Sequence, residues 1–151
     1  MALDFETTLE KFGEKVMKRH ESVKKRASFG LFSAILISTP KLDGYLQNAW
    51  TIEFNNSALG RGTKTVEELD VPDSVEKPIG AKANELKEQL NGMSLSASLQ
   101  DIYYTNPLPY AQRIEYEGYS AKAPTGMVRI NVANWDKYVK SAVAWAKREV
   151  R

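Results

Sequence analysis

The chain has 151 residues, 42% of them hydrophobic, and this length suits one domain, residues 1–151, with its own core. Its 21 basic and 19 acidic residues leave a net charge of +2, too balanced to indicate a nucleic-acid binder from total charge. It has no cysteine, which excludes disulfides, thiolate metal sites and cysteine nucleophiles. The acidic start does not resemble an export signal, and no apolar run reaches the ~20 residues of a membrane helix. We therefore expect a soluble intracellular protein without membrane contact.

Apolar residues recur every three or four positions near the start of the chain, apart from one gap at His20, which predicts a long amphipathic helix. They are Phe5, Leu9, Phe12, Val16, Val23 and Ala27. The middle of this helix is basic, with Lys11, Lys15, Lys18, Arg19, Lys24, Lys25 and Arg26. Such a face is typical of a solvated helix, and the alternative is a surface for an acidic partner or a DNA backbone. Residues 28–38 predict a more buried continuation, which ends at Thr39-Pro40.

Residues 50–54 alternate between apolar and polar, which predicts a strand with one buried face. Residues 56–80 then form a polar tract with acidic residues, three glycines and two prolines. A long stretch without periodicity is uncommon inside a compact domain. We interpret it as an extended arm or hairpin that orders against a neighbour, with a disordered surface loop as the alternative.

Residues 81–91 predict a short helix with Ala83, Leu86 and Leu90 on one side and Gly92 as its cap. The strand formers at 102–104 follow, and we expect this strand to pair with the strand at 50–54.

Pro107 and Pro109 force a turn, because each lacks an N–H and has a fixed φ. Helical spacing then returns from Tyr110 to Glu117, and Gly118 is expected to end this turn of helix in a left-handed conformation. An apolar stripe of constant phase predicts one last helix from about Gly126 to Arg148, although residues 128–132 also fit a strand. The predicted class is α+β: a small antiparallel sheet flanked by long N-terminal and C-terminal amphipathic helices, with a long polar loop or arm.

The segment 106–135, NPLPYAQRIEYEGYSAKAPTGMVRINVANW, resembles the C-terminal signature of the neck and tail-completion family of long-tailed bacteriophages. The segment 38–50, STPKLDGYLQNAW, resembles the turn between the first helix and the first strand of the same family. This chain lacks the threonine that the family places between the residues here numbered Asp43 and Gly44.

The resemblance implies a virion structural protein at the head-tail junction, without catalytic activity or cofactor. It implies a homo-oligomeric ring, with a hexamer favoured, that completes or terminates the tail and joins it to the head connector. The implied partners are a head-closure or connector protein, the tail tube protein, and DNA that passes through the lumen without sequence-specific binding. The implied location is the neck of the virion, and the host cytoplasm during assembly.

We expect the subunit interface to use acidic residues of the arm and residues of the tyrosine-rich segment. The candidate interface residues are Arg61, Glu67, Glu68, Asp70, Tyr116, Tyr119 and Lys122. Rings need two different faces on each subunit, and an acidic arm can complement the basic first helix. The tyrosines beside Arg113 can alternatively stack bases, but tyrosine and arginine are equally typical of protein interfaces.

The sequence contains no catalytic or metal-ligating constellation that we can identify. The only histidine, His20, lies among lysines, and residues 59–64 lack the spacing of a phosphate-binding loop. We therefore predict no enzyme activity, no cofactor and no metal. The rival interpretation is a small nucleic-acid-binding or regulatory protein, which the basic first helix would favour.

Overall fold

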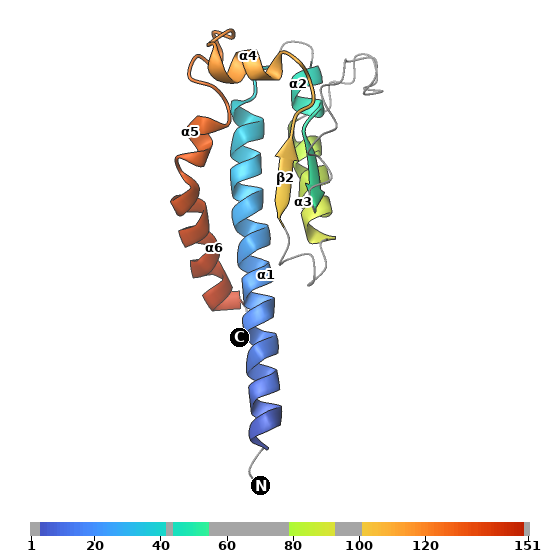
Figure 1. Cartoon of the computed structure of the whole chain (residues 1–151), viewed down its shortest axis with the longest axis vertical. Helices are drawn as coiled ribbons and strands as arrows, with labels where there is room; N and C mark the ends of the chain where they lie inside the picture. The colour runs from blue at the N-terminus through green and yellow to red at the C-terminus, as the bar shows by residue number, and fades with distance from the viewer. Residues whose placement is uncertain (1–3, 42–43, 55–78, 93–100, 150–151) are drawn as a thin grey trace.

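The computed structural model describes residues 4–41, 44–54, 79–92 and 101–149. The long helix α1 (Phe5–Ser38) forms the axis of the molecule, and α6 (Trp135–Glu149) packs along one side of it (Figure 1). The strands β1 (Thr51–Phe54) and β2 (Ile102–Thr105) and the helix α3 (Ile79–Asn91) lie on the other side. The short helices are α2 (Tyr45–Asn48), α4 (Ala111–Tyr116) and α5 (Arg129–Val132). The predicted α+β class is therefore confirmed.

The C-terminal end of α1 is fastened to the first strand through Thr39. Its hydroxyl donates to the Ile35 carbonyl at 2.8 Å and accepts a hydrogen bond from the Trp50 indole N–H at 2.9 Å. The Gln47 side chain donates to the Thr39 carbonyl at 3.0 Å. Because Pro40 cannot continue the helix, these bonds satisfy polar groups that the end of α1 would leave buried and unpaired.

The two strands pair antiparallel, as predicted, with Thr51 opposite Thr105 and Phe54 opposite Ile102. The hydroxyls of Thr51 and Thr105 lie 3.1 Å apart. The ring of Tyr104 is stacked between Phe32 of α1, at 4.4 Å between centroids, and Trp50, at 4.5 Å. This stack joins the sheet to α1, and Tyr104 is partly buried against the core.

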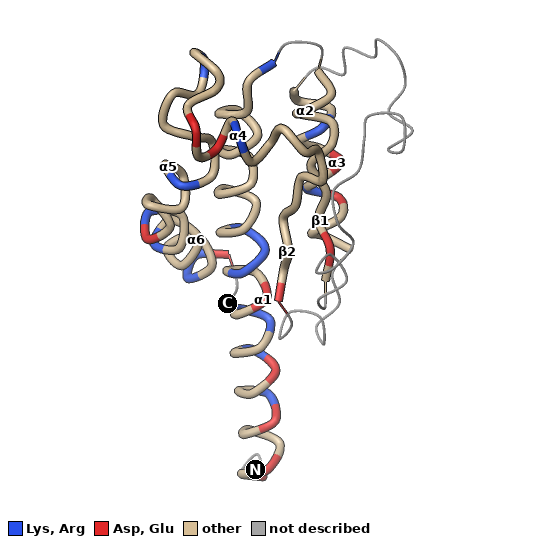
Figure 2. Tube along the Cα trace, turned by 45° about the horizontal axis from the view of Figure 1, so that its top comes forward, with Lys and Arg blue, Asp and Glu red and all other residues tan. Residues whose placement is uncertain are grey.

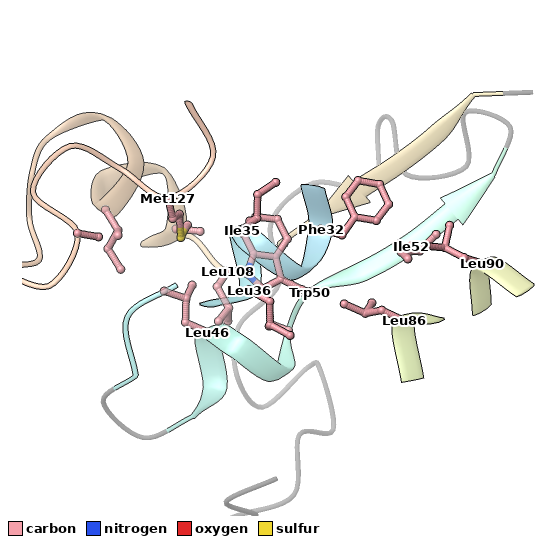
Figure 3. Close-up of a cluster of buried hydrophobic side chains, with 14 residues drawn as sticks. Phe32, Ile35, Leu36, Leu46, Trp50, Ile52, Leu86, Leu90, Leu108 and Met127 are labelled. Carbon is pink, nitrogen blue, oxygen red and sulfur yellow. The ribbon is translucent and has the colours of Figure 1, made fainter. Parts of the chain in front are cut away.

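The hydrophobic core lies around the C-terminal half of α1 (Figure 3). From α3 it receives Leu86 and Leu90, as the sequence predicts, although α3 begins at Ile79 and not at Ala81. The other large buried side chains are Phe32, Ile35, Leu36, Leu46, Trp50, Ile52, Leu108, Ile114 and Met127.

The last helix is not continuous from residue 126, so this prediction was wrong. Residues 127–129 are held by a side chain of α4, α5 occupies only Arg129–Val132, and α6 starts at Trp135. At the break the Asn134 N–H bonds to the Asn131 carbonyl, and the Asn134 side chain donates to the Ile130 carbonyl at 2.9 Å. The Asn134 side chain thus takes the Ile130 carbonyl, which the Asn134 backbone N–H would bind in a regular α-helix.

Helix α6 approaches α1 closely because small residues lie between them. Ala27, Ala142 and Ala146 are at most 2% exposed, and a Cβ added to Gly30 would stand 3.0 Å from the Tyr138 ring. The Arg26 guanidinium covers the Trp145 ring at 4.7 Å. None of the helices in the described part of the chain has the length and apolar composition needed to cross a membrane.

Candidate functional site

The proline-rich turn after β2 is built around Asn106. Its side-chain oxygen accepts a hydrogen bond from the Leu108 N–H at 3.2 Å, and its amide donates to the Leu46 carbonyl at 2.7 Å. The two prolines on either side of the buried Leu108 restrict the backbone further. The turn therefore places α4 across the end of α1, next to α2 (Figure 1).

Glu115 of α4 organises the loop that leads into α5. Its carboxylate accepts hydrogen bonds from the backbone N–H groups of Met127 at 2.7 Å, Val128 at 2.8 Å and Arg129 at 2.9 Å. The Arg129 Nε donates to the same carboxylate at 3.1 Å, and the Arg129 Nη2 donates to the Glu115 carbonyl. Each carboxylate oxygen thus accepts two hydrogen bonds. With all its acceptor positions used, Glu115 serves as a structural clasp and not as a free base.

The residue is 6% exposed, and this burial by itself would raise the pKa of Glu115. The hydrogen bonds from the backbone of residues 127–129 and from the Arg129 side chain outweigh it, so the pKa lies below the ordinary value. The charged form of the clasp is therefore stable at neutral pH.

Glycines allow the loop to close on this clasp. Gly118 has φ +61°, as predicted for the residue that ends α4, and Gly126 has φ +90°. The loop between them is tied back to the α1–α2 connection, because the Lys122 Nζ donates to the Lys41 carbonyl at 3.0 Å.

An arginine guanidinium stacks over each of the two exposed tyrosine rings of this region, Tyr116 and Tyr119. The Arg113 guanidinium lies 4.3 Å from the centre of the Tyr119 ring, and the Arg129 guanidinium lies 4.9 Å from that of Tyr116. Tyr116 and Tyr119 are 64% and 62% exposed, whereas Tyr104 is stacked between Phe32 and Trp50 against the core. The tyrosines therefore do not share one stacking surface.

Beside Tyr119 lies a cavity of about 620 Å³, which we call the loop hollow. It is bounded by the α1–α2 connection, α4 and the loop after α4. Its walls include Pro40, Leu46, Tyr110, Ile114, Tyr119 and Ala121, with Lys41 and Lys122 as charged members.

The other unusual surface is the first half of α1, which extends past the rest of the protein (Figures 1 and 2). We call its apolar residues Phe5, Leu9, Phe12 and Val16 the N-terminal stripe. They are 78%, 57%, 64% and 47% exposed, and no described residue covers them. The sequence predicted this stripe but not that it is uncovered.

Of the predicted interface residues, Tyr116, Tyr119 and Lys122 lie on α4 and the following loop, with Tyr119 and Lys122 both at the loop hollow. Arg61, Glu67, Glu68 and Asp70, and the whole predicted arm apart from the start of α3, lie outside the described residues. The structure adds Glu115, Gly126 and Arg129, which the sequence analysis did not select. The one feature of the sequence that could have indicated these residues is Gly126, which precedes the final apolar stripe.

His20 is exposed on α1, and the described residues contain no group of three or more side chains suited to hold a metal ion. Comparison with protein-family models, with curated proteins and with solved structures finds no match.

Proposed function

We propose that the chain is a structural subunit of a bacteriophage head-tail junction, which assembles into a ring that completes the tail and docks it to the head connector. The observation that carries this proposal is the N-terminal stripe, four apolar side chains 47–78% exposed on a projecting helix. Exposed apolar patches of this kind mark surfaces that another molecule covers. The sequence resemblance of residues 106–135 supports the location.

The arrangement of Glu115 and its loop supports a structural role. Its carboxylate is saturated with N–H donors and positions backbone, which suits a surface that must keep its shape during assembly. A preorganised surface loses less conformational freedom on binding.

The proposed location can be tested on purified virions of the phage that encodes the chain. Gold-labelled antibodies raised against the protein should mark the head-tail junction in negative-stain micrographs, and mass spectrometry of the particles should detect the protein. Its absence from the particles, or label on the capsid or the distal tail only, would contradict the proposal.

The second candidate is nucleic-acid binding, favoured by the exposed side chains of Lys11, Lys15 and Lys18 on α1. Such binding would weaken steeply as salt rises, because displaced counterions drive it. Filter binding with duplex DNA at two salt concentrations distinguishes the candidates, since a ring subunit that lets DNA pass should bind it weakly at both.

A further inference from the structure

We infer that the projecting first half of α1 in one copy of this chain docks on the loop hollow of the next copy, so that subunits join head to tail. This inference rests on the self-assembly part of the proposed function. It specifies the two surfaces and their chemistry.

The inserted element is the N-terminal stripe. Phe5, Leu9, Phe12 and Val16 follow at intervals of four, three and four residues, which places them on one face of the helix. That face is roughly 17 Å long at the rise of an α-helix. Its large apolar side chains suit a groove with apolar walls.

The receiving element is the loop hollow, which has aromatic and aliphatic walls. Its volume of about 620 Å³ is large enough for aromatic side chains such as Phe5 or Phe12. The hydrogen bond from the Lys122 Nζ to the Lys41 carbonyl joins two of its walls.

The net charges of the two elements are opposite. Residues 4–16, which include the whole stripe, carry Asp4, Glu6, Glu10 and Glu14 against Lys11 and Lys15, four acidic residues and two basic. The hollow has two lysines, Lys41 and Lys122, and no acidic side chain among its described lining residues. Attraction between them orients the approach of two copies.

The same charges disfavour the simplest alternative, a symmetric pairing of two N-terminal stripes. Such a pairing brings two segments with an excess of negative charge together, which costs free energy. The N-terminal end of α1 instead lies at the opposite end of the molecule from α2 and α4 (Figure 1), whose residues line the hollow. A contact between two different surfaces is heterologous, and it forms a ring when the rotation between subunits closes.

A mixing experiment tests this directly with the full-length chain. The stripe variant carries Phe5→Ser and Phe12→Ser, and the hollow variant carries Lys41→Glu, which keeps the backbone carbonyl that Lys122 binds. The mass of each sample in low-salt buffer is measured by light scattering after gel filtration. Circular dichroism and thermal melting verify that both variants stay folded, as expected for residues exposed on the surface.

We expect wild type to form oligomers and each variant alone to self-associate at least tenfold more weakly. An equimolar mixture should recover a 1:1 complex, because the hollow variant has an intact stripe and the stripe variant an intact hollow. A second variant with Glu6→Lys and Glu10→Lys should likewise bind the hollow variant more tightly than it binds itself.

Three results would overturn the inference: a monomeric wild type at every concentration, a hollow variant that assembles as well as wild type, or a mixture that remains monomeric. If the mixing experiment fails but gold-labelled antibodies mark the head-tail junction, this interface is contradicted and the proposed function stands. If the variants form a 1:1 complex but the protein is absent from virions, the interface stands and the proposed function is contradicted.

Discussion

Gly126 lies so close to Glu115 that a Cβ added to the glycine would stand 2.7 Å from the Glu115 carbonyl oxygen and 2.8 Å from its Oε1. With φ at +90°, Gly126 also has a backbone conformation that other residues rarely adopt. The loop before α5 can therefore wrap around the carboxylate only with glycine at this position.

Replacing Gly126 with alanine should lower the free energy of unfolding by about 2 kcal/mol or more, because strain and a clash with backbone act together. Urea denaturation measures the change. The matched control is Gly13→Ala, where an added Cβ meets nothing within 4 Å. That variant should be neutral or slightly stabilising, and equal losses in the two variants would contradict the special role of Gly126.

Glu115→Gln should destabilise the protein by about 1–3 kcal/mol at neutral pH, since an amide cannot accept four hydrogen bonds as a carboxylate does. Glu117→Gln is the control, because Glu117 pairs with Arg113 at the surface, with 59% of its side chain exposed. Its effect should stay within about 0.5 kcal/mol.

The Glu115 carboxylate also makes the stability of the fold depend on pH in the acidic range. The folded-state pKa of Glu115 lies below its ordinary value of 4.5, so its contribution is fully present above that value. It is lost as the pH falls through the folded-state pKa. Wild type should therefore lose more stability than Glu115→Gln on acidification, as measured by thermal melting. Parallel pH profiles would show that the clasp is not ionised.

Tyr104→Phe should leave stability unchanged or raise it by up to about 1 kcal/mol, because the buried hydroxyl has no hydrogen-bond partner among the described residues. Burial raises the pKa of Tyr104. The unfolded tyrosine ionises near pH 10 while the folded one stays neutral, so wild type should lose stability above this pH. Tyr104→Phe should lose less, and the exposed Tyr116→Phe should behave as wild type.

Thr39→Val should cost about 1–3 kcal/mol, because it leaves the buried Trp50 N–H without its acceptor. Thr39→Ser keeps the hydroxyl and is the matched control, with a smaller loss from the missing methyl group. Chemical denaturation followed by tryptophan fluorescence measures both. Equal losses would mean that packing, and not the hydrogen bond, makes Thr39 important.

The elements that the sequence predicted well are those that side-chain periodicity defines. The alternation around Ile52 and the strand formers near Tyr103 identified two strands, and the Thr39-Pro40 pair identified the end of α1. In each case the local preference and the tertiary packing agree.

The clasp could not be predicted because Glu115 binds backbone N–H groups twelve to fourteen residues later, which leave no side-chain pattern. The same interaction holds residues 127–129, so the final apolar stripe keeps its phase while the helix is interrupted at Asn134. Periodicity likewise shows that Phe5 and Phe12 share a face, but it does not show whether any other residue covers that face.

The most direct test of a junction subunit is complementation of an extract from phage that lacks this gene. Heads joined to tails are counted by negative-stain microscopy after addition of purified protein. Wild type and Gly13→Ala should both restore joining, whereas the variant with Phe5→Ser and Phe12→Ser should not, because its stripe no longer meets a neighbour. If wild type fails to restore joining, or if heads and tails join equally well without it, the account is contradicted.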